Sequence, residues 1–246
     1  MTIRLVPVKS FSNPNLPMGD FSSLLNRPEA LGVYEMLGTY DASGNGKNLK
    51  MGGHTFNQLG LVSKPVKGFY VDTGILEPDV FTVVVATNIN NPSQLPIPGS
   101  IPNIISSFSE VAAPFSGHRL ALTSSGIPHL AVGKTSGSPI QALSGNTAIG
   151  GWTVYAYTVD GKKLALQRSS GVVVNAEGAE SDIKSPAKRT ICIAGNPTTD
   201  TVTGATTMPP DGVIGCLGIY AGDFGVGGRA QLINDATSIM KKRGVM

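Results

Sequence analysis

Short apolar runs rich in Val, Ile, Thr, Tyr and Phe recur along the chain from Leu31 onward. Gly, Asn, Asp or Pro interrupts them roughly every eight to twelve residues, a spacing typical of strands joined by turns. The pattern predicts strands at 33–37, 48–51, 68–71, 80–88, 104–108, 118–123, 129–132, 152–159, 163–168, 171–175, 190–193 and 213–220. It therefore favours an all-β fold.

One pair of strands is specified by its turn. Asp160 and Gly161 lie between the apolar segments 152–159 and 163–168, and an Asp-Gly pair in that position is a strong hairpin signal. Ser169, Ser170 and Gly171 then predict a second turn and a third strand. The segment is expected to form an antiparallel meander.

Helical spacing is limited to the two ends of the chain. At the C-terminus, residues 229–243 carry an apolar stripe, with basic residues in the last turn and Gly244 as a cap. The stripe consists of Leu232, Ile233, Ala236, Ile239 and Met240. Near the start, Asp20 can cap a short helix that carries Leu24 and Leu25 and ends before Pro28.

The composition fits one sizeable β-domain. Of the 246 residues 41% are hydrophobic and 14% charged, and the 31 glycines and 17 prolines follow no period. The net charge of +3 comes from scattered residues, with basic clusters only at 184–189 and 241–243. Neither cluster contains aromatic residues, so they indicate a solvated surface, and no nucleic-acid binding is expected.

The first 19 residues differ from the rest. They contain three prolines and several Ser and Asn residues, with apolar side chains at Ile3, Leu5, Val6 and Val8. We therefore divide the chain into an extended arm, 1–19, and one sandwich domain, 20–246. No secretory signal and no run of membrane-spanning length is recognised, which predicts synthesis in a host cytoplasm and no membrane insertion.

Several segments, in this order, resemble concanavalin A-like, laminin-G-like modules. These segments are 41–46, 78–85, 152–168, 191–195 and 211–220. The first contains an Asp and two Gly residues, and the third is the hairpin that contains the tryptophan. The resemblance covers about residues 30–243. It implies a jelly-roll sandwich of two large antiparallel sheets, with ligand-binding loops at one rim or a binding site on the concave face.

The resemblance leaves the function open, because this fold occurs in lectins, carbohydrate-binding modules, glycosidases, adhesion modules and viral proteins. Laminin-G modules often close their C-terminus with a disulfide, but Cys216 has no cysteine partner in the final helix, which disfavours an oxidised extracellular module. A sandwich with a Pro-rich arm and without a signal resembles a component of a bacteriophage particle.

Candidate catalytic residues are sparse. Glycosidases of this fold place acids on one strand, with the two carboxyl groups about 5 Å apart in retaining enzymes. Glu77 and Asp79 have the spacing of such a pair, but Pro78 separates them and no third acid follows. The acids of 177–182 lie in a Gly- and Ala-rich segment that is expected to be a loop.

Other chemistries have weaker signals. His54, His118 and His129 are isolated in the sequence, and each is expected to be structural or exposed. Gly225–Gly228 lacks the Lys and Ser/Thr of a phosphate loop, so a plain turn is predicted there. We therefore assign no catalytic residue.

The candidate ligand-binding residues are aromatic. Tyr155 and Tyr157 share one face of their predicted strand and can line a concave binding face, or they can cover the second side of the sandwich. Trp152 lies on the other face with Val154 and Ala156, and we predict that it belongs to the core.

The candidate metal is calcium. Asp41, Ser43 and Asn45 supply alternate oxygen atoms in a Gly-rich turn, with Asp72 as a further ligand, and the resembled modules often bind calcium near this place. The alternative interpretation is an Asx turn between strands, which we favour.

The sequence thus predicts a non-enzymatic component of a virion, in a bacteriophage tail, baseplate or head surface. The expected partners are other virion proteins, reached through the arm, further copies of the chain, and a host surface glycan. The alternatives are a free carbohydrate-binding lectin and an unusual glycoside hydrolase.

Overall fold

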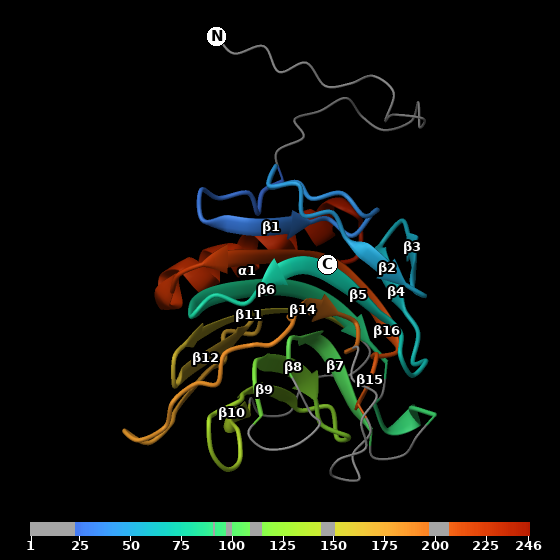
Figure 1. The fold of residues 1–246 in the computed structure, drawn as a ribbon. Helices are drawn as coiled ribbons and strands as arrows, with labels where there is room; N and C mark the ends of the chain where they lie inside the picture. The colour runs from blue at the N-terminus through green and yellow to red at the C-terminus, as the bar shows by residue number, and fades with distance from the viewer. Residues whose placement is uncertain (1–22, 91, 97–99, 109–114, 144–150, 197–206) are drawn as a thin grey trace.

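A computed structural model describes residues 23–90, 92–96, 100–108, 115–143, 151–196 and 207–246. The proposed arm therefore lies outside the described residues. Two sheets lie one above the other in Figure 1, and a long C-terminal helix covers the far side of the upper one. This arrangement confirms the predicted two-sheet antiparallel sandwich with a C-terminal helix.

Sheet A lies next to the helix and contains eight strands. In spatial order they are β13 (Val173–Glu177), β12 (Lys163–Arg168), β11 (Trp152–Asp160), β6 (Val80–Ile89), β16 (Gly212–Ala221), β4 (Gly60–Ser63) and β3 (Thr55–Asn57), while β1 (Ala30–Tyr34) also pairs with β16. All of these pairings are antiparallel.

Sheet B lies on the opposite side of the core and also contains eight strands. Its order is β10 (Ile140–Leu143), β9 (Pro128–Val132), β8 (His118–Leu122), β7 (Ile101–Ser106), β14 (Thr190–Ile193), β5 (Tyr70–Leu76) and β2 (Lys50–Gly52). The two-residue β15 (Thr207–Met208) pairs with β7 in parallel, and a short 3-10 helix, η2 (Pro92–Gln94), precedes β7.

The core consists of two layers because sheet A is covered on both faces. Side chains alternate along a strand, so Val83 and Val85 of β6 point toward sheet B. Val84 and Ala86 of the same strand point toward the helix α1 (Gly225–Lys242). Burial on both faces explains why seven of the ten positions of β6 are apolar.

The predicted hairpin is present, but its turn lies one residue further along than expected. Asp160 pairs with Lys163, so the two loop residues are Gly161 and Lys162. Gly161 has a φ of 53°, and Lys162 has no positive φ. This is the pattern of a type II′ turn, which favours glycine at its first central position.

The helix predictions require two corrections. Helix α1 begins at Gly225, so Gly225–Gly228 forms its first turn and not a separate loop. The packing of the apolar stripe on sheet A stabilises this glycine-rich turn in spite of its low helix propensity. Residues 23–29 form turns and no helix, although Leu25 is buried against α1. No helix of the described residues has the length and apolar character needed to span a membrane.

Candidate functional site

The outer face of sheet B, which points away from sheet A, carries a row of mostly polar residues. Strand register places these residues side by side across seven strands: Lys50, Asp72, Cys192, Ser106, Arg119, Ala131 and Gln141. The next row is apolar, and apart from the exposed Met51 at the edge its members belong to the core: Val71, Ile193, Ile105, Leu120, Leu130 and Ala142. Sheet B therefore has one apolar and one largely polar face.

Four polar side chains on this face surround two alanines. Ala121 lies between Asn103 and His129 in one row, and Ala131 lies between Arg119 and Gln141 in the adjacent row. We call Asn103, Arg119, His129 and Gln141 the polar quartet. Both alanines are 0% exposed, so the middle of the quartet is covered.

The quartet contains hydrogen-bonding atoms that the fold does not use. Both amide atoms of Asn103 and the Nε2 of His129 have no hydrogen-bond partner among the described residues, although the two side chains are 0% and 7% exposed. Leaving a buried polar atom unpaired costs about 1–3 kcal/mol. Gln141 is exposed, so the quartet reaches solvent at the β10 end.

Charge and aromatic rings lie beside the quartet. The guanidinium carbon of Arg119 is 5.0 Å from the ring centroid of Phe108, and this ring stacks on Phe115. Burial, and then the charge of Arg119, lower the pKa of His129 to about 4, against an opposing hydrogen bond that His129 donates to Gln141. His129 is therefore neutral near pH 7 and offers one donor and one acceptor nitrogen.

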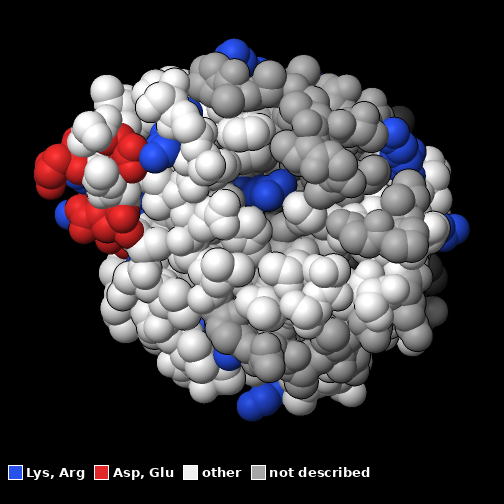
Figure 2. Space-filling model, turned by 90° about the horizontal axis from the view of Figure 1, so that it is seen from below, with Lys and Arg blue, Asp and Glu red and all other residues white. Residues whose placement is uncertain are grey.

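Figure 2 views the molecule from the side on which β8, β9 and β10 lie. Most of the coloured surface is uncharged, basic side chains are scattered, and acidic ones gather at one edge. The described part of this face therefore lacks the broad basic stripe that a nucleic-acid groove requires.

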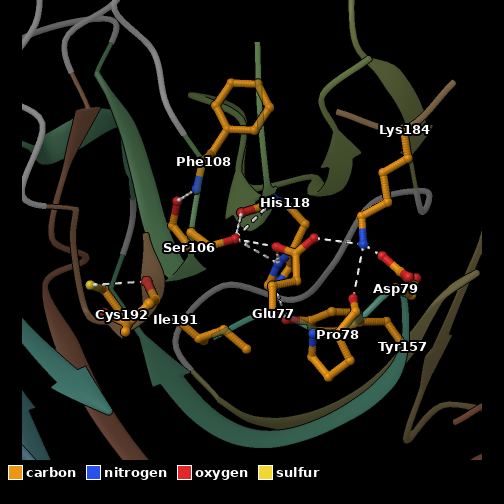
Figure 3. A network of polar contacts seen from close by, with 12 residues as sticks. Glu77, Pro78, Asp79, Ser106, Phe108, His118, Tyr157, Lys184, Ile191 and Cys192 are labelled. Carbon is orange, nitrogen blue, oxygen red and sulfur yellow. Dashed lines mark hydrogen bonds and ion pairs between the residues drawn. The ribbon is translucent and has the colours of Figure 1, made fainter. Parts of the chain in front are cut away.

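A second cluster of polar groups lies inside the sandwich (Figure 3). Glu77 follows β5, Ser107 follows β7, and His118 begins β8, so all three come from the sheet B side. Tyr157 comes from β11 of sheet A, and Lys184 comes from the segment before β14. The cluster thus connects the two sheets.

Each polar side chain of this cluster has a partner within it. His118 Nδ1 lies 2.7 Å from Glu77 Oε2, and His118 Nε2 lies 2.8 Å from the Tyr157 hydroxyl. Lys184 Nζ lies 2.8 Å from Glu77 Oε1, and the Ser107 hydroxyl donates to Glu77 Oε2. Because a carboxylate only accepts, the proton of each of these contacts to Glu77 comes from its partner.

The charges in this cluster stabilise one another. Burial raises the pKa of Glu77, but the charges and hydrogen bonds of His118 and Lys184 outweigh it and lower that pKa to about 2. Burial, and then the negative charge of Glu77, raise the pKa of Tyr157, so its hydroxyl stays protonated. The cluster contains a Ser, a His and a Glu, but the side chains of Glu77 and His118 are 0% exposed and no substrate can reach them. We conclude that the cluster is structural.

The two acids with glycosidase spacing do not face a common space. Glu77 points into the core, whereas Asp79 lines a surface hollow of about 300 Å³ near the β11–β12 turn. Lys184 lies between them and bonds to the carbonyl of Asp79. Two carboxylates that act on one glycosidic bond must flank it, and these two do not.

The tyrosines predicted as ligand-binding residues lie in the core. Tyr155 and Tyr157 are 3% and 0% exposed, and both pack between the sheets. The structure thus selects the second alternative, in which they cover the inner side of sheet A. It corrects their placement on an open concave face, because a ring without exposed surface cannot stack on a ligand.

Trp152 lies on the helix side of sheet A, as its alternation with the tyrosines predicts. It is partly buried and packs against the cluster that includes Met240 of α1. It is therefore a core residue at the margin of the helix layer.

In the predicted calcium loop, backbone N–H groups already bond to the carboxylate oxygens of Asp41. Asp41 is 1% exposed, and its Oδ1 accepts hydrogen bonds from the N–H groups of Val33 and Ser43. Its Oδ2 accepts one from Lys47, and the N–H of Asn45 bonds to the Ser43 hydroxyl. This is the geometry of an Asx turn.

The remaining predicted ligand, Asp72, is engaged elsewhere. Its Oδ1 accepts from the Thr190 hydroxyl at 2.6 Å and from the N–H of Gly74 at 2.8 Å. Among the described residues, no group of three or more His, Cys, Asp or Glu side chains is placed to hold a metal ion.

Sequence reasoning missed the polar quartet. Its four members lie on separate strands, so only the register between β7, β8, β9 and β10 brings them together. A usable signal was present, because residues 118–122 and 128–132 both carry a polar residue and an alanine at neighbouring alternate positions.

Comparison with known proteins identifies relatives by fold alone. No protein-family model and no curated protein matches the chain. Domain 4 of AbnA, an extracellular GH43 arabinanase from Geobacillus stearothermophilus solved in complex with arabinotriose, superposes with a TM-score of 0.52 at 15% identity. The match covers 83% of this chain and 98% of that domain.

Two further structures superpose at lower identity. A Trypanosoma rangeli sialidase gives a TM-score of 0.59 at 10% identity over 87% of this chain and 33% of its own. The binding domain of botulinum neurotoxin serotype D gives 0.57 at 11% identity over 87% of this chain and 51% of its own. The fold is thus the concanavalin A-like jelly-roll sandwich.

Proposed function

We propose that this chain is a non-catalytic glycan-binding module and that the polar quartet on the outer face of sheet B contacts the sugar. The observation that carries the proposal is the exposed Gln141, which bonds to His129 and connects the hydrogen-bonding atoms of the quartet to solvent. A fold that leaves such atoms unpaired without a ligand loses stability that a ligand can restore.

The chemistry of the quartet suits a carbohydrate. Asn103 and Gln141 each carry donors and an acceptor, and Arg119 carries donors only. Neutral His129 offers its Nε2, because its other ring nitrogen bonds to Gln141. A sugar ring carries hydroxyl groups that donate and accept at similar spacing, so one oligosaccharide can pair with several members. AbnA domain 4, which shares the fold, was solved with arabinotriose bound.

The alternative of a glycoside hydrolase has less support. The two carboxylates with suitable sequence spacing point to different places, and Glu77 has no exposed side-chain surface. We therefore retain binding without hydrolysis as the proposed activity.

The proposed setting is a bacteriophage particle, on its tail, baseplate or head surface, with the glycan belonging to the host surface. The support for this setting is the Pro-rich arm, whose composition suits wrapping a neighbouring subunit better than forming a domain. Mass spectrometry of purified particles from the source culture tests it, and absence of the chain from intact particles would contradict it.

Glycan binding is tested with an array of neutral and acidic oligosaccharides that includes arabinotriose, followed by calorimetry on each hit. The variant Gln141→Ala should weaken binding by about tenfold, the loss expected for one or two hydrogen bonds. The matched control is Gln58→Ala, because Gln58 is also exposed but lies in the β3–β4 turn. Equal affinities of the two variants, or no binding at millimolar sugar, would rule the proposal out.

A further inference from the structure

The edge strand β13 has a row of backbone groups that no described strand uses. Sheet A ends at β13, which pairs with β12 on one side only. The Arg168 N–H bonds to the Val172 carbonyl, and the Gly178 N–H bonds to the Lys162 carbonyl. Because hydrogen-bonding direction alternates along a strand, residues 173, 175 and 177 point their N–H and C=O groups away from the sheet.

The side chains at this edge do little to block an incoming strand. Val172 and Val173 are 38% and 36% exposed, and no proline or lysine protects positions 173–177. The side chains of Val174 and Ala176 point inward and pack against the core. A strand added at this edge would extend both the ladder and the apolar inner surface.

We propose that residues 3–8 of the N-terminal arm of a second copy of this chain add to β13 as an antiparallel strand. Pro7 has no N–H, so it must face away from the ladder, which directs the backbone groups of Arg4, Val6 and Val8 toward β13. Residues 173, 175 and 177 present the matching groups.

The side chains then select one register. If Arg4 lies opposite Glu177, Val6 lies opposite Asn175 and Val8 opposite Val173. On the inner face Leu5 lies opposite Ala176, which continues the apolar surface. Glu177 has no ion pair among the described residues, although Lys163 lies across the ladder from it.

Charge favours β13 as the binding site of the arm. Residues 1–19 contain Arg4 and Lys9 and no acid, whereas Glu177 at the end of β13 and Glu180 just after it are exposed acids. The sheet order favours a second copy as the source of the arm, because β6, β11 and β12, which α1 covers, separate β13 from the β1–β16 side of sheet A. The exposed face of α1 carries Gln231, Asn234 and Ser238, which give an apolar arm nothing to bury against.

The first test measures association of the full chain by sedimentation velocity. Asn175→Pro removes an outward N–H without touching a bond to β12, and it should weaken association by at least about tenfold. Asn175→Thr keeps the N–H and should stay within about twofold of the parent chain. A parent chain that remains monomeric, or a proline variant that associates as strongly as the parent, overturns the proposal.

The second test determines the register between the arm and β13 and shows whether a second copy supplies the arm. The double variant Arg4→Cys with Glu177→Cys places two Cα atoms about 5.5 Å apart, within the range that a disulfide spans. Cys192 and Cys216 are buried and should not compete. A disulfide-linked dimer on a non-reducing gel supports the proposal, whereas a cross-link within one chain or no cross-link contradicts it.

Discussion

His118 of sheet B and Tyr157 of sheet A are joined across the core by a contact of 2.8 Å between the ring Nε2 and the tyrosine hydroxyl. The other ring nitrogen contacts Glu77, which also pairs with Lys184. A polar link between two apolar sheets constrains their relative position, because sliding one sheet would leave buried polar atoms unpaired.

Removing this link should destabilise the sandwich. Tyr157→Phe keeps the ring and leaves His118 Nε2 unpaired, so the free energy of unfolding should fall by about 1–3 kcal/mol. Thermal unfolding followed by circular dichroism measures the change, and Tyr40→Phe is the matched control because Tyr40 is 69% exposed. Equal melting temperatures for the two variants would show that the link contributes nothing.

Two buried groups, His129 on the outer face of sheet B and Glu77 in the core, predict how stability depends on pH. His129 has a folded-state pKa of about 4, below its ordinary 6.5, so its contribution is complete above pH 6.5 and is lost as the pH falls toward 4. Glu77 has a pKa of about 2, below its ordinary 4.5, so its contribution is lost between pH 4.5 and 2.

Two variants distinguish the contributions of His129 and Glu77 in these two pH ranges. His129→Gln should flatten the fall in melting temperature between pH 6.5 and 4, and Glu77→Gln should flatten the fall below 4.5. Glu77→Gln should also lower stability at neutral pH by roughly 3–5 kcal/mol, because it leaves Lys184 without its buried partner. Unchanged pH profiles in both variants would show that these groups do not control acid unfolding.

Local signals account for what could be predicted from the sequence. The β11–β12 hairpin is specified by residues in its own turn, and α1 by a stripe such as Leu232, Ala236 and Ile239. The start of α1 was predicted too late because packing on sheet A, which is not visible in the sequence, overrides the glycines of its first turn.

The candidate site depends on long-range register and was therefore missed. Asn103 and Gln141 are 38 positions apart in the sequence and meet on one face only because β7, β8, β9 and β10 pair in a particular alignment. Tyr155 and Tyr157 were ambiguous for a related reason. A strand covered by a helix on one face and a sheet on the other gives no polar alternation to show which side is open.

Helix α1 is anchored at its C-terminal end by Arg243. Its Nη1 donates to the carbonyls of Gly215 and Leu59, and its Nη2 donates to the carbonyl of Glu35. Arg243→Met retains the aliphatic stem and should cost about 2–4 kcal/mol, because three carbonyls lose a charged donor.

The readout for this variant is amide hydrogen exchange combined with thermal unfolding. Exchange in the last turn of α1 should accelerate more than exchange in β6, which lies in the core of sheet A. Lys242→Met is the matched control, since Lys242 is the exposed neighbour. If both variants exchange like the parent chain, Arg243 does not hold the helix end.

The loop at Asp41 should be independent of calcium. Three backbone N–H groups already donate to the Asp41 carboxylate, so a cation would have to compete with groups that point their positive ends at the same oxygens. Asp41→Ala should therefore lower the free energy of unfolding by about 2–3 kcal/mol with or without metal, because three backbone donors, of which the Val33 N–H is buried, lose their acceptor. Ser43→Ala is the control, because it removes a hydroxyl that accepts only one hydrogen bond of 3.3 Å.

The measurement is the melting temperature of each variant in millimolar calcium and in chelator. A calcium-dependent rise in the parent chain that both variants abolish would show that the loop binds the ion, and the Asx-turn interpretation would then be wrong.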